Sequence, residues 1–530
     1  MTTAFSFDED MPTELIAQIL SHLDFHSMLK CRAVCSKFQY VIDSSPHYHW
    51  KSELALAGME DGYNYSLASS REMLAEHQAG WNNLRWTNEE WVQIHEHGYW
   101  ELCGNVLAQQ SEDGSALQFM RLPSKSREVT VAKWTVHGKI FQMHDFCIDP
   151  SQDLLIVIEQ PFWDQNDFMC RIFLWTLSTG EPHPLVAETH VLTHVLQVKQ
   201  NLMVEQHVTG ICGDALGILF EHVNSDVKEF VFWNWKTGEI IAHITADYVR
   251  SFTFLSERHV MLGDHIQPAL VVVDIVAEDP KLQTLDEVEN AFTFHFPSMA
   301  VGADVLGMKI RSDPAPGWKP GSVPFFTARH NHLVFINILI HRRDSATGRT
   351  EVSLYALSSS FLSLIRNATA QKSEHFDWLS WGPEGSRMTL YHFRLLEHWM
   401  RYVYGTRHVS SRWLPEASYI YMYDFNQLAL RWSQDREKSS DVSLGSGRDK
   451  GYTPDEPGEG EAEAYINVTE PTKITDCEIF EGEVESRLGY RMKRWPAPRN
   501  RSVRTVMCTE DGIVLVYGND TEETYHIMTV

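Results

Sequence analysis

The sequence predicts an α+β multidomain protein in which an all-α N-terminal region precedes a much longer all-β domain. Apolar residues recur at helical spacing from residue 11 to about residue 97. After about residue 98, apolar and polar residues alternate along short runs that Gly, Asp, Ser and Asn turns separate. One stretch in this second part occurs twice almost letter for letter, which indicates a repeated structural unit.

The segment from residue 11 to residue 42 carries more apolar surface than so short a chain can bury. Pro12 suits a first helical position, and Asp10 and Glu14 lie where a helix dipole favours acids. A unit of this length falls below the roughly 40 residues at which a domain folds without a metal, disulfides or a partner. We therefore expect another protein to cover its helical stripe, which contains Met11, Leu15, Ile16, Ile19, Leu20 and Leu23.

Residue types and spacings in this segment resemble the F-box. The matching positions are Pro12, Glu14, Leu15, Ile16, Ile19, Leu20, Leu23, Ser27, Leu29, Arg32, Val34, Cys35, Lys37 and Phe38. Two positions depart from the family pattern, Met11 in place of Leu and Met28 in place of an acid, and both are apolar. The alternative is an ordinary amphipathic helical hairpin that packs on its own protein.

The resemblance implies docking onto the Skp-family adaptor of SCF ubiquitin ligases and, through it, onto the cullin and RING subunits. The residues that it implies for adaptor binding are Met11, Pro12, Leu15, Ile16, Ile19, Leu20, Leu23, Leu29, Cys31, Val34, Cys35 and Phe38.

The rest of the N-terminal region is also predicted to be helical. We expect a flexible N-terminus at residues 1–10, the F-box at 11–50 and a helical linker at 51–97. Gly58 is predicted to end one helix, and the following helix is predicted to turn Leu74, Trp81 and Leu84 inward. The linker resembles the segment that follows the F-box in fungal-type F-box proteins, so we expect it to be a rigid strut.

Bulk properties of the 530-residue chain exclude several classes of partner. Lys and Arg number 45 against 71 acids, a formal charge of −26, which argues against nucleic acid or an anionic membrane as a partner. The N-terminus is acidic, and the longest apolar runs are far shorter than the roughly 20 residues of a membrane helix. The eight cysteines contain no C-x-x-C pair, which favours a reducing compartment, cytoplasmic or nuclear.

The repeated stretch of the all-β part is FLWTLSTGE at 173–181 and VFWNWKTGE at 231–239. A strand with a terminal aromatic, a Thr-Gly turn and a second strand predict the inner hairpin of a propeller blade. The pattern resembles WD-repeat blades, although the family's His and terminal Trp-Asp are missing or displaced. We therefore predict a divergent WD-like β-propeller over residues 98–530, with a pair of β-sandwiches as the alternative.

The number of blades is predicted to be seven. The candidate segments are 100–137, 140–185, 206–246, 250–286, 323–366, 375–433 and 500–530. Ring closure requires the two ends of the domain to meet in one sheet, because open strand edges invite aggregation. We expect a strand near Trp100–Leu107 to pair within the blade of the terminal hairpin, whose turn would be Gly518-Asn519-Asp520.

An insertion at about residues 434–464 is rich in Asp, Glu, Gly, Ser and Pro, and is expected to be a disordered loop on the propeller rim. A run of cations follows it. Because guanidinium groups match phosphate oxygens, the run predicts a site for a phosphorylated or acidic target, and the alternative is a solvated strand face. Its members are Arg487, Arg491, Lys493, Arg494, Arg499, Arg501 and Arg504.

Motifs for catalysis and cofactor binding are missing from the sequence. Two pairs of histidines have the i, i+4 spacing of metal ligands, His190 with His194 and His22 with His26, but neither forms H-E-x-x-H. We expect no metal, no cofactor and no catalytic residue.

The hypothesis that follows is a non-catalytic substrate-recognition subunit of an SCF-type ubiquitin ligase. Its F-box would bind the adaptor, and its propeller would bind a protein target of unknown identity. The alternatives are an F-box scaffold that does not promote degradation and a propeller enzyme with an unrelated helical N-terminus.

Overall fold

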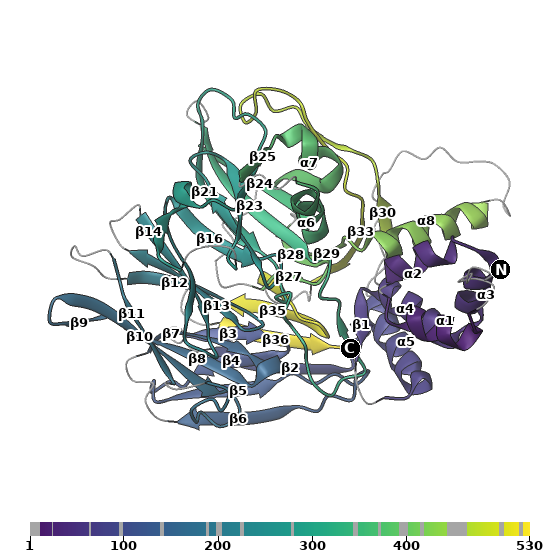
Figure 1. Ribbon diagram of the computed structural model, residues 1–530, viewed down its shortest axis with the longest axis horizontal. Coiled ribbons are helices and arrows are strands. Elements are labelled where there is room, and N and C mark those ends of the chain that lie inside the picture. The colour runs from purple at the N-terminus through teal and green to yellow at the C-terminus, as the bar shows by residue number, and fades with distance from the viewer. Residues whose placement is uncertain are drawn as a thin grey trace, which may run out of the picture.

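The computed structural model describes residues 11–23, 25–62, 65–94, 99–137, 143–186, 190–197, 204–222, 227–276, 280–342, 348–368, 373–391, 401–413, 418–441, 464–497, 503–518 and 523–530. A group of helices lies on one side of a large assembly of sheets (Figure 1). In the described part of the chain, no helix is long and apolar enough to cross a membrane.

The N-terminal helices pack around one small core. They are α1 (Thr13–Ser21), α2 (Phe25–Arg32), α3 (Ser36–Ser44) and α4 (Pro46–Ala57), followed by α5 (Leu67–Asn83). Ile16, Leu20, Met28, Val41 and Tyr48 are buried together, so α4 completes the core of the first three helices. Gly58 ends α4 in the left-handed conformation, as expected from the sequence.

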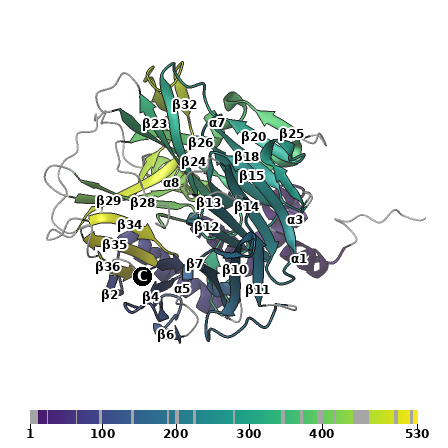
Figure 2. The same ribbon diagram turned by 90° about the vertical axis from the view of Figure 1, so that its left-hand side faces the viewer.

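Seven sheets of four or five strands form the β-domain. Turning the view by 90° shows them arranged around a common axis, which confirms a seven-bladed propeller (Figure 2). We number the blades along the chain.

The strands of blades 1 to 4 follow one another along the chain, except for β19 and β25, which come from later segments and pair at the outer edges of blades 3 and 4. Blade 1 contains β3 (Trp100–Cys103), β4 (Val106–Gln110), β5 (Ala116–Arg121) and β6 (Ala132–His137). Blade 2 contains β7 (Met143–Asp149), β8 (Leu154–Glu159), β9 (Phe162–Asp164), β10 (Asp167–Thr176) and β11 (Val191–Val195). Blade 3 contains β12 (Val204–Cys212), β13 (Ala215–His222), β14 (Val227–Asn234), β15 (Ile240–Asp247) and β19 (Leu282–Thr284). Blade 4 contains β16 (Val249–Phe254), β17 (His259–Asp264), β18 (Ala269–Asp274), β20 (Ala291–His295) and β25 (Ser373–Phe376).

Blades 5 to 7 contain insertions or a strand from elsewhere in the chain. Blade 5 contains β21 (Ala303–Arg311), β23 (Leu333–Arg342), β24 (Arg349–Leu357) and β26 (Ser386–Tyr391). Blade 6 contains β27 (Val403–Tyr404), β28 (Arg407–Trp413), β29 (Ser418–Asp424), β33 (Tyr490–Pro496) and β30 (Ile466–Val468). Blade 7 contains β34 (Val503–Cys508), β35 (Gly512–Gly518), β36 (Glu523–Thr529) and β2 (Asn88–Ile94).

The insertions explain why the predicted limits of the later blades are wrong. Helices α6 (Ser358–Asn367) and α7 (Trp378–Gly385) separate β24 from β26, so the outer strand of blade 5 falls inside a segment predicted for the next blade. Helix α8 (Gln427–Asp441) and the pair β31 (Thr472–Ile474) and β32 (Val484–Ser486) separate β29 from β33. Residues 434–441 of the predicted disordered insertion continue α8, and residues 442–463 lie outside the described residues.

The hydrophobic core runs between neighbouring blades around the ring. Phe230 of blade 3 packs in one cluster with Phe252 of blade 4, for example, and Leu107 of blade 1 packs with Tyr525 of blade 7. First strands of successive blades, such as β3 with β7 and β12 with β16, contact one another along the axis. Each blade is therefore buried on both faces, which fits the nearly continuous apolar runs of strands such as β8 and β18.

Closure of the ring differs from the prediction. The strand β3 pairs with β4 in blade 1, whereas β2 pairs with β36 from Asn88 opposite Thr529 to Ile94 opposite Glu523. The end of the predicted helical linker is thus a strand, and it supplies the outer edge of blade 7. Gly518 pairs with Glu523, and the predicted turn residues Asn519 and Asp520 lie outside the described residues.

The repeated hairpin also occupies a different place from the one predicted. The first four residues of FLWTLSTGE are the last of β10, and the first four of VFWNWKTGE are the last of β14. These are the third strands of blades 2 and 3. Each Thr-Gly turn therefore leads toward the strand that pairs on the outer side of the third strand, β11 in blade 2 and β15 in blade 3, rather than joining two inner strands. Gly180 and Gly238 have φ values of 72° and 79°, the left-handed conformation that glycine adopts most readily.

Candidate protein-docking surface

Helix α1 divides its apolar residues between two faces. Ile16 and Leu20 point into the helical core, where each is nearly inaccessible to solvent. Leu15 and Ile19 lie on the other face and are about half exposed. The predicted apolar stripe is therefore divided into two. The helical core covers the stripe of Ile16 and Leu20, whereas the stripe of Leu15 and Ile19 stays exposed.

Further exposed apolar residues lie on the elements that follow α1. Leu29 belongs to α2, and Val34 lies in the connection between α2 and α3. We call the following four side chains, with their exposed fractions, the exposed F-box residues: Leu15 (48%), Ile19 (46%), Leu29 (42%) and Val34 (68%). Apolar side chains exposed together on so small a unit indicate a site for another protein.

The other residues predicted for adaptor binding have structural roles in part. Met11, Leu23, Cys31 and Phe38 are partly buried against the helical core. Pro12 is exposed, and its carbonyl accepts the N–H groups of Leu15 and Ile16 at 3.1 Å each, where α1 begins. Cys35 precedes α3, and its Sγ accepts the N–H of Phe38 at 3.5 Å.

Hydrogen bonds to main-chain carbonyls tie the first helices to α4. The Tyr48 hydroxyl donates to the carbonyl of Ala17 at 2.8 Å. Lys51 Nζ donates to the carbonyls of Ser21 and Leu23 at 2.6 and 2.8 Å, close to the C-terminus of α1. Carbonyls at a helix end have no partner within the helix, so a lysine there satisfies them and complements the dipole.

A buried ionic network joins the helices to the propeller. The Arg127 guanidinium donates to Asp511 Oδ1 and to Glu510 Oε2 at 2.7 Å each, and His77 Nε2 of α5 lies 3.3 Å from Asp511 Oδ1. Glu510 also accepts the N–H of Thr327, and Asp511 accepts the side-chain amide of Asn105. The network thus connects the linker with blades 1 and 7.

The charges of this network are strongly stabilised. Burial alone would raise the pKa of Asp511, but Arg127 and His77 outweigh it and lower that pKa to about 2. The pKa of the Arg127 guanidinium is raised, because the two carboxylates outweigh its burial. Burial lowers the pKa of His77 more than Asp511 raises it. Removing one partner by substitution would leave an uncompensated buried charge, which lowers the free energy of unfolding by about 3–5 kcal/mol.

A second contact crosses the propeller face that bears the helices. Strand β1 (Met59–Asp61) of the linker pairs with β22 (Phe325–Thr327), which follows β21 of blade 5. In the segment between β21 and β22, Trp318 lies against Gly104 of blade 1, where even a Cβ would clash with its ring. Helix α5, through the ionic network, and strand β1, through its pairing with β22, therefore hold the helices at a fixed place on the propeller.

The propeller axis is nearly filled on this side. A cavity of about 90 Å³ is lined by residues from all seven blades and is bounded by Trp318. Arg401 bridges Glu101 and Asp313 inside it, at 2.6 and 2.7 Å. The cavity has room for only a few water molecules, so it is too small to admit a segment of another protein.

The predicted cationic site is engaged within the protein at its described positions. Arg487 pairs with Glu485 and Glu384, Arg504 pairs with Glu523, and the buried pair of Arg491 with Asp424 joins β33 to β29. Lys493 is buried and donates to the carbonyl of Asn82, and the Arg494 guanidinium lies over the Tyr419 ring. Arg499 and Arg501 lie outside the described residues.

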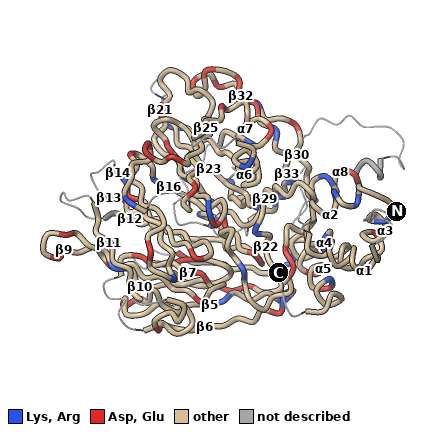
Figure 3. The backbone as a smooth tube through the Cα atoms, in the orientation of Figure 1, with Lys and Arg blue, Asp and Glu red and all other residues tan. Residues whose placement is uncertain are grey.

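Charges of both signs are mixed along the described chain. Acidic and basic positions are interspersed along the propeller (Figure 3). The cationic run itself meets acids from its own and neighbouring strands.

Comparison with known proteins identifies the N-terminal part. Residues 9–50 match the F-box domain model. The protein is therefore an F-box protein, and the chain that follows the F-box and its linker folds into a seven-bladed β-propeller. The comparison with curated proteins gives no match.

Solved structures of low similarity include a polysaccharide lyase and a β-propeller domain. The polysaccharide lyase Uly1 shares 8% identity at a TM-score of 0.33, over 89% of this chain and 96% of that one. The β-propeller domain of Nup133 from Vanderwaltozyma polyspora shares 8% identity at a TM-score of 0.33, over 83% and 97%. Both scores are low, so neither structure carries an argument about function.

The ionic network and the outer strand β2 were not predicted. Asp511 interacts with His77 and Arg127, which are hundreds of positions away in the sequence, and no local spacing marks such a group. The sequence indicates only that Glu510 and Asp511 occupy a turn.

Proposed function

We propose that this protein is the substrate-recognition subunit of an SCF-type ubiquitin ligase. The observation that carries the proposal is the set of exposed F-box residues in a segment that matches the F-box domain model. Their apolar side chains are not used by the protein's own core, and a Skp-family adaptor would cover them. The cullin and RING subunits would then be recruited through the adaptor.

The geometry of the propeller supports a receptor role. The hairpin of β9 projects on the side of the molecule opposite the F-box helices (Figure 1). The ionic network and the β1–β22 pair lie on the near side, so the far face stays accessible to a target. A rigid joint that holds a target away from the adaptor would raise its local concentration at the transferring enzyme.

The chain itself would contribute proximity and no chemistry. Binding of an acidic or phosphorylated target by the cationic run stays a prediction, and such a target would compete with the internal partners of Arg487 and Arg504. The eight cysteines are free thiols, which fits our expectation of a cytoplasmic or nuclear protein. A scaffold that binds the adaptor without promoting degradation is the second candidate.

The adaptor interaction can be tested by substitution of the exposed F-box residues. We expect Leu15→Asp with Ile19→Asp to weaken adaptor binding about 100-fold or more, because two carboxylates would be buried at the interface. The melting temperature should stay within about 2 °C of wild type, since neither side chain belongs to the helical core. Binding is measured by titration with purified adaptor.

A matched control places two carboxylates on exposed apolar positions far from the F-box, Val301→Asp with Leu379→Asp. This control should bind the adaptor like wild type. Substitution of Leu20 would not be informative, because Leu20 is only 2% exposed and an Asp there would unfold the helices. Wild-type affinity in the Leu15/Ile19 variant would refute the proposal.

A further inference from the structure

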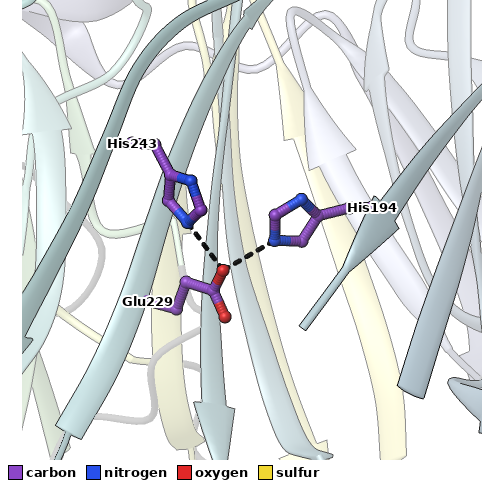
Figure 4. A group of neighbouring side chains, drawn as sticks. All are labelled: His194, Glu229 and His243. Atoms are coloured by element: carbon purple, nitrogen blue, oxygen red, sulfur yellow. Dashed lines mark hydrogen bonds and ion pairs between the residues drawn. The ribbon is translucent and has the colours of Figure 1, made fainter. Parts of the chain in front are cut away.

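Three polar side chains converge between the outer strands of blades 2 and 3. His194 belongs to β11, Glu229 to β14 and His243 to β15. The Nε2 atoms of both histidines lie 2.7 Å from the same oxygen, Glu229 Oε1 (Figure 4). The register of β14 and β15 pairs Val231 with His243, which puts Glu229 and His243 diagonally on one sheet face.

The surroundings fix these side chains in place. All three residues are buried. The second carboxylate oxygen, Glu229 Oε2, accepts the N–H of Gln197 at 3.1 Å. The His194 ring stacks on Phe220, with ring centroids 5.4 Å apart, and meets the edge of Trp233. A carboxylate oriented by a second hydrogen bond inside an apolar shell is the usual arrangement around a metal ligand.

Among the residues that the structure describes, the carboxylate of Glu229 is buried without a Lys or Arg partner. Its hydrogen bonds in the described part of the chain come from two imidazoles and one backbone N–H. A buried carboxylate with such partners favours a cation beside it.

We propose that His194, Glu229 and His243 bind a divalent transition-metal ion, of which Zn²⁺ is the best fit. Two imidazoles and one carboxylate form a common three-residue ligand set for Zn²⁺, and a water molecule completes the tetrahedron. The three ligand atoms lie within 4.8 Å of one another. Tetrahedral ligand atoms at 2.0–2.1 Å from zinc are roughly 3.3 Å apart. Each Nε2 now lies 2.7 Å from Glu229 Oε1, so binding of the ion requires each imidazole to move away from this oxygen by roughly half an ångström.

The bound ion would have a structural role. It would clamp β11, at the outer edge of blade 2, to β14 and β15 of blade 3, away from the axis where the first strands of the blades contact one another. Without the ion, two imidazole N–H groups can donate to Glu229, so the blades stay joined more weakly. The site is independent of adaptor binding, and its test needs no partner protein.

The first experiment measures metal content. The full chain is purified through a tag that contains no histidine, and metals are quantified by mass spectrometry. We expect about one equivalent of zinc per chain after dialysis against metal-free buffer, and a fall of a few degrees in melting temperature after removal of zinc by a strong chelator. Absence of zinc, together with no response of the melting temperature to added Zn²⁺, would overturn the proposal.

Variants locate the ion. His243→Gln and His194→Gln keep a donor for Glu229 but remove a ligand, and each should lose at least nine-tenths of the zinc. His183→Gln is the matched control, because His183 is also buried but bonds the carbonyl of Gln152. Retention of zinc in both ligand variants would refute this site.

A measurement on the wild-type protein covers the case in which the variants do not fold. X-ray absorption at the zinc edge should show two imidazoles and oxygen around the metal. Sulfur ligands would instead place the zinc at thiols such as Cys477, which is exposed, and would also refute the site.

Discussion

Asp145 is a residue whose ionisation should oppose folding. It lies on β7 of blade 2, where burial raises its pKa to about 7 although the Phe146 N–H donates to it, and Glu101 raises the pKa further. In the unfolded chain an aspartate ionises near pH 4. The folded protein therefore keeps a proton between about pH 4 and pH 7 that the unfolded chain has lost.

Stability should accordingly fall as the pH rises through this window. Between pH 5 and pH 8, the free energy of unfolding should fall less in Asp145→Asn, which cannot ionise there, than in wild type. We expect the difference between the two falls to be about 2 kcal/mol. Thermal unfolding of both proteins across this range measures the difference. Parallel pH profiles would show that Asp145 is ionised in the folded protein.

The F-box residues show what the sequence can and cannot predict at this scale. Residue type and spacing were sufficient to identify the F-box, because the whole pattern falls within a few dozen consecutive positions. They were not sufficient to separate Leu15 from Ile16, since both lie on one broad apolar arc until the following helices cover half of it. That division depends on Met28, Val41, Ile42 and Tyr48, which share the core with Ile16.

At the scale of the element, the repeated hairpin offers a comparison within one protein. Gly180 and Gly238 have the same left-handed conformation, but their surroundings differ. A Cβ on Gly180 would lie 2.3 Å from Val136 Cγ1 of blade 1, whereas the nearest atom to a Cβ on Gly238 is Leu192 Cδ2 at 3.5 Å.

Alanine at the two positions should therefore have unequal costs. We expect Gly238→Ala to destabilise by about 1–2 kcal/mol, the cost of the left-handed conformation, and Gly180→Ala to cost at least about 1 kcal/mol more because of the clash. Urea unfolding midpoints of the two variants measure this order. Equal midpoints would mean that Val136 yields without cost.

Strand β2 shows why ring closure was mispredicted. Its sequence, NEEWVQI, follows a helix directly, and only Trp91, Val92 and Ile94 are apolar, so local pattern alone does not mark it as a blade strand. Its partner β36 lies at the other end of the chain. The count of seven blades could be predicted because each blade is largely local in sequence, whereas the closing pair and the insertions in blades 5 and 6 are not.

At the scale of the whole molecule, the ionic network at Arg127 should decide how firmly the F-box is held. We expect Arg127→Met to destabilise the protein by about 3–5 kcal/mol, because Glu510 and Asp511 stay buried without their cation. Arg71→Met is the control, since Arg71 pairs with Glu53 at the surface and such a pair contributes at most about 1 kcal/mol.

Thermal unfolding of the two variants separates a buried joint from an ordinary surface pair. Similar losses of stability in both would show that the network is not buried in solution.

The ionic network at Arg127 could not be predicted from the sequence, and neither could the cluster of His194, Glu229 and His243. Each of them joins residues of separate blades or domains.

The central claim is that one chain links a target on its propeller to a ligase through its F-box. The most direct measurement is affinity purification of the wild-type protein and of the Leu15→Asp, Ile19→Asp variant from cells with a blocked proteasome, followed by quantification of co-purified proteins and of their ubiquitin modification. We predict that both capture the same targets, but that only wild type captures adaptor and cullin and carries ubiquitylated targets. Capture of adaptor by the variant, or equal ubiquitylation of the targets in both samples, would contradict the claim.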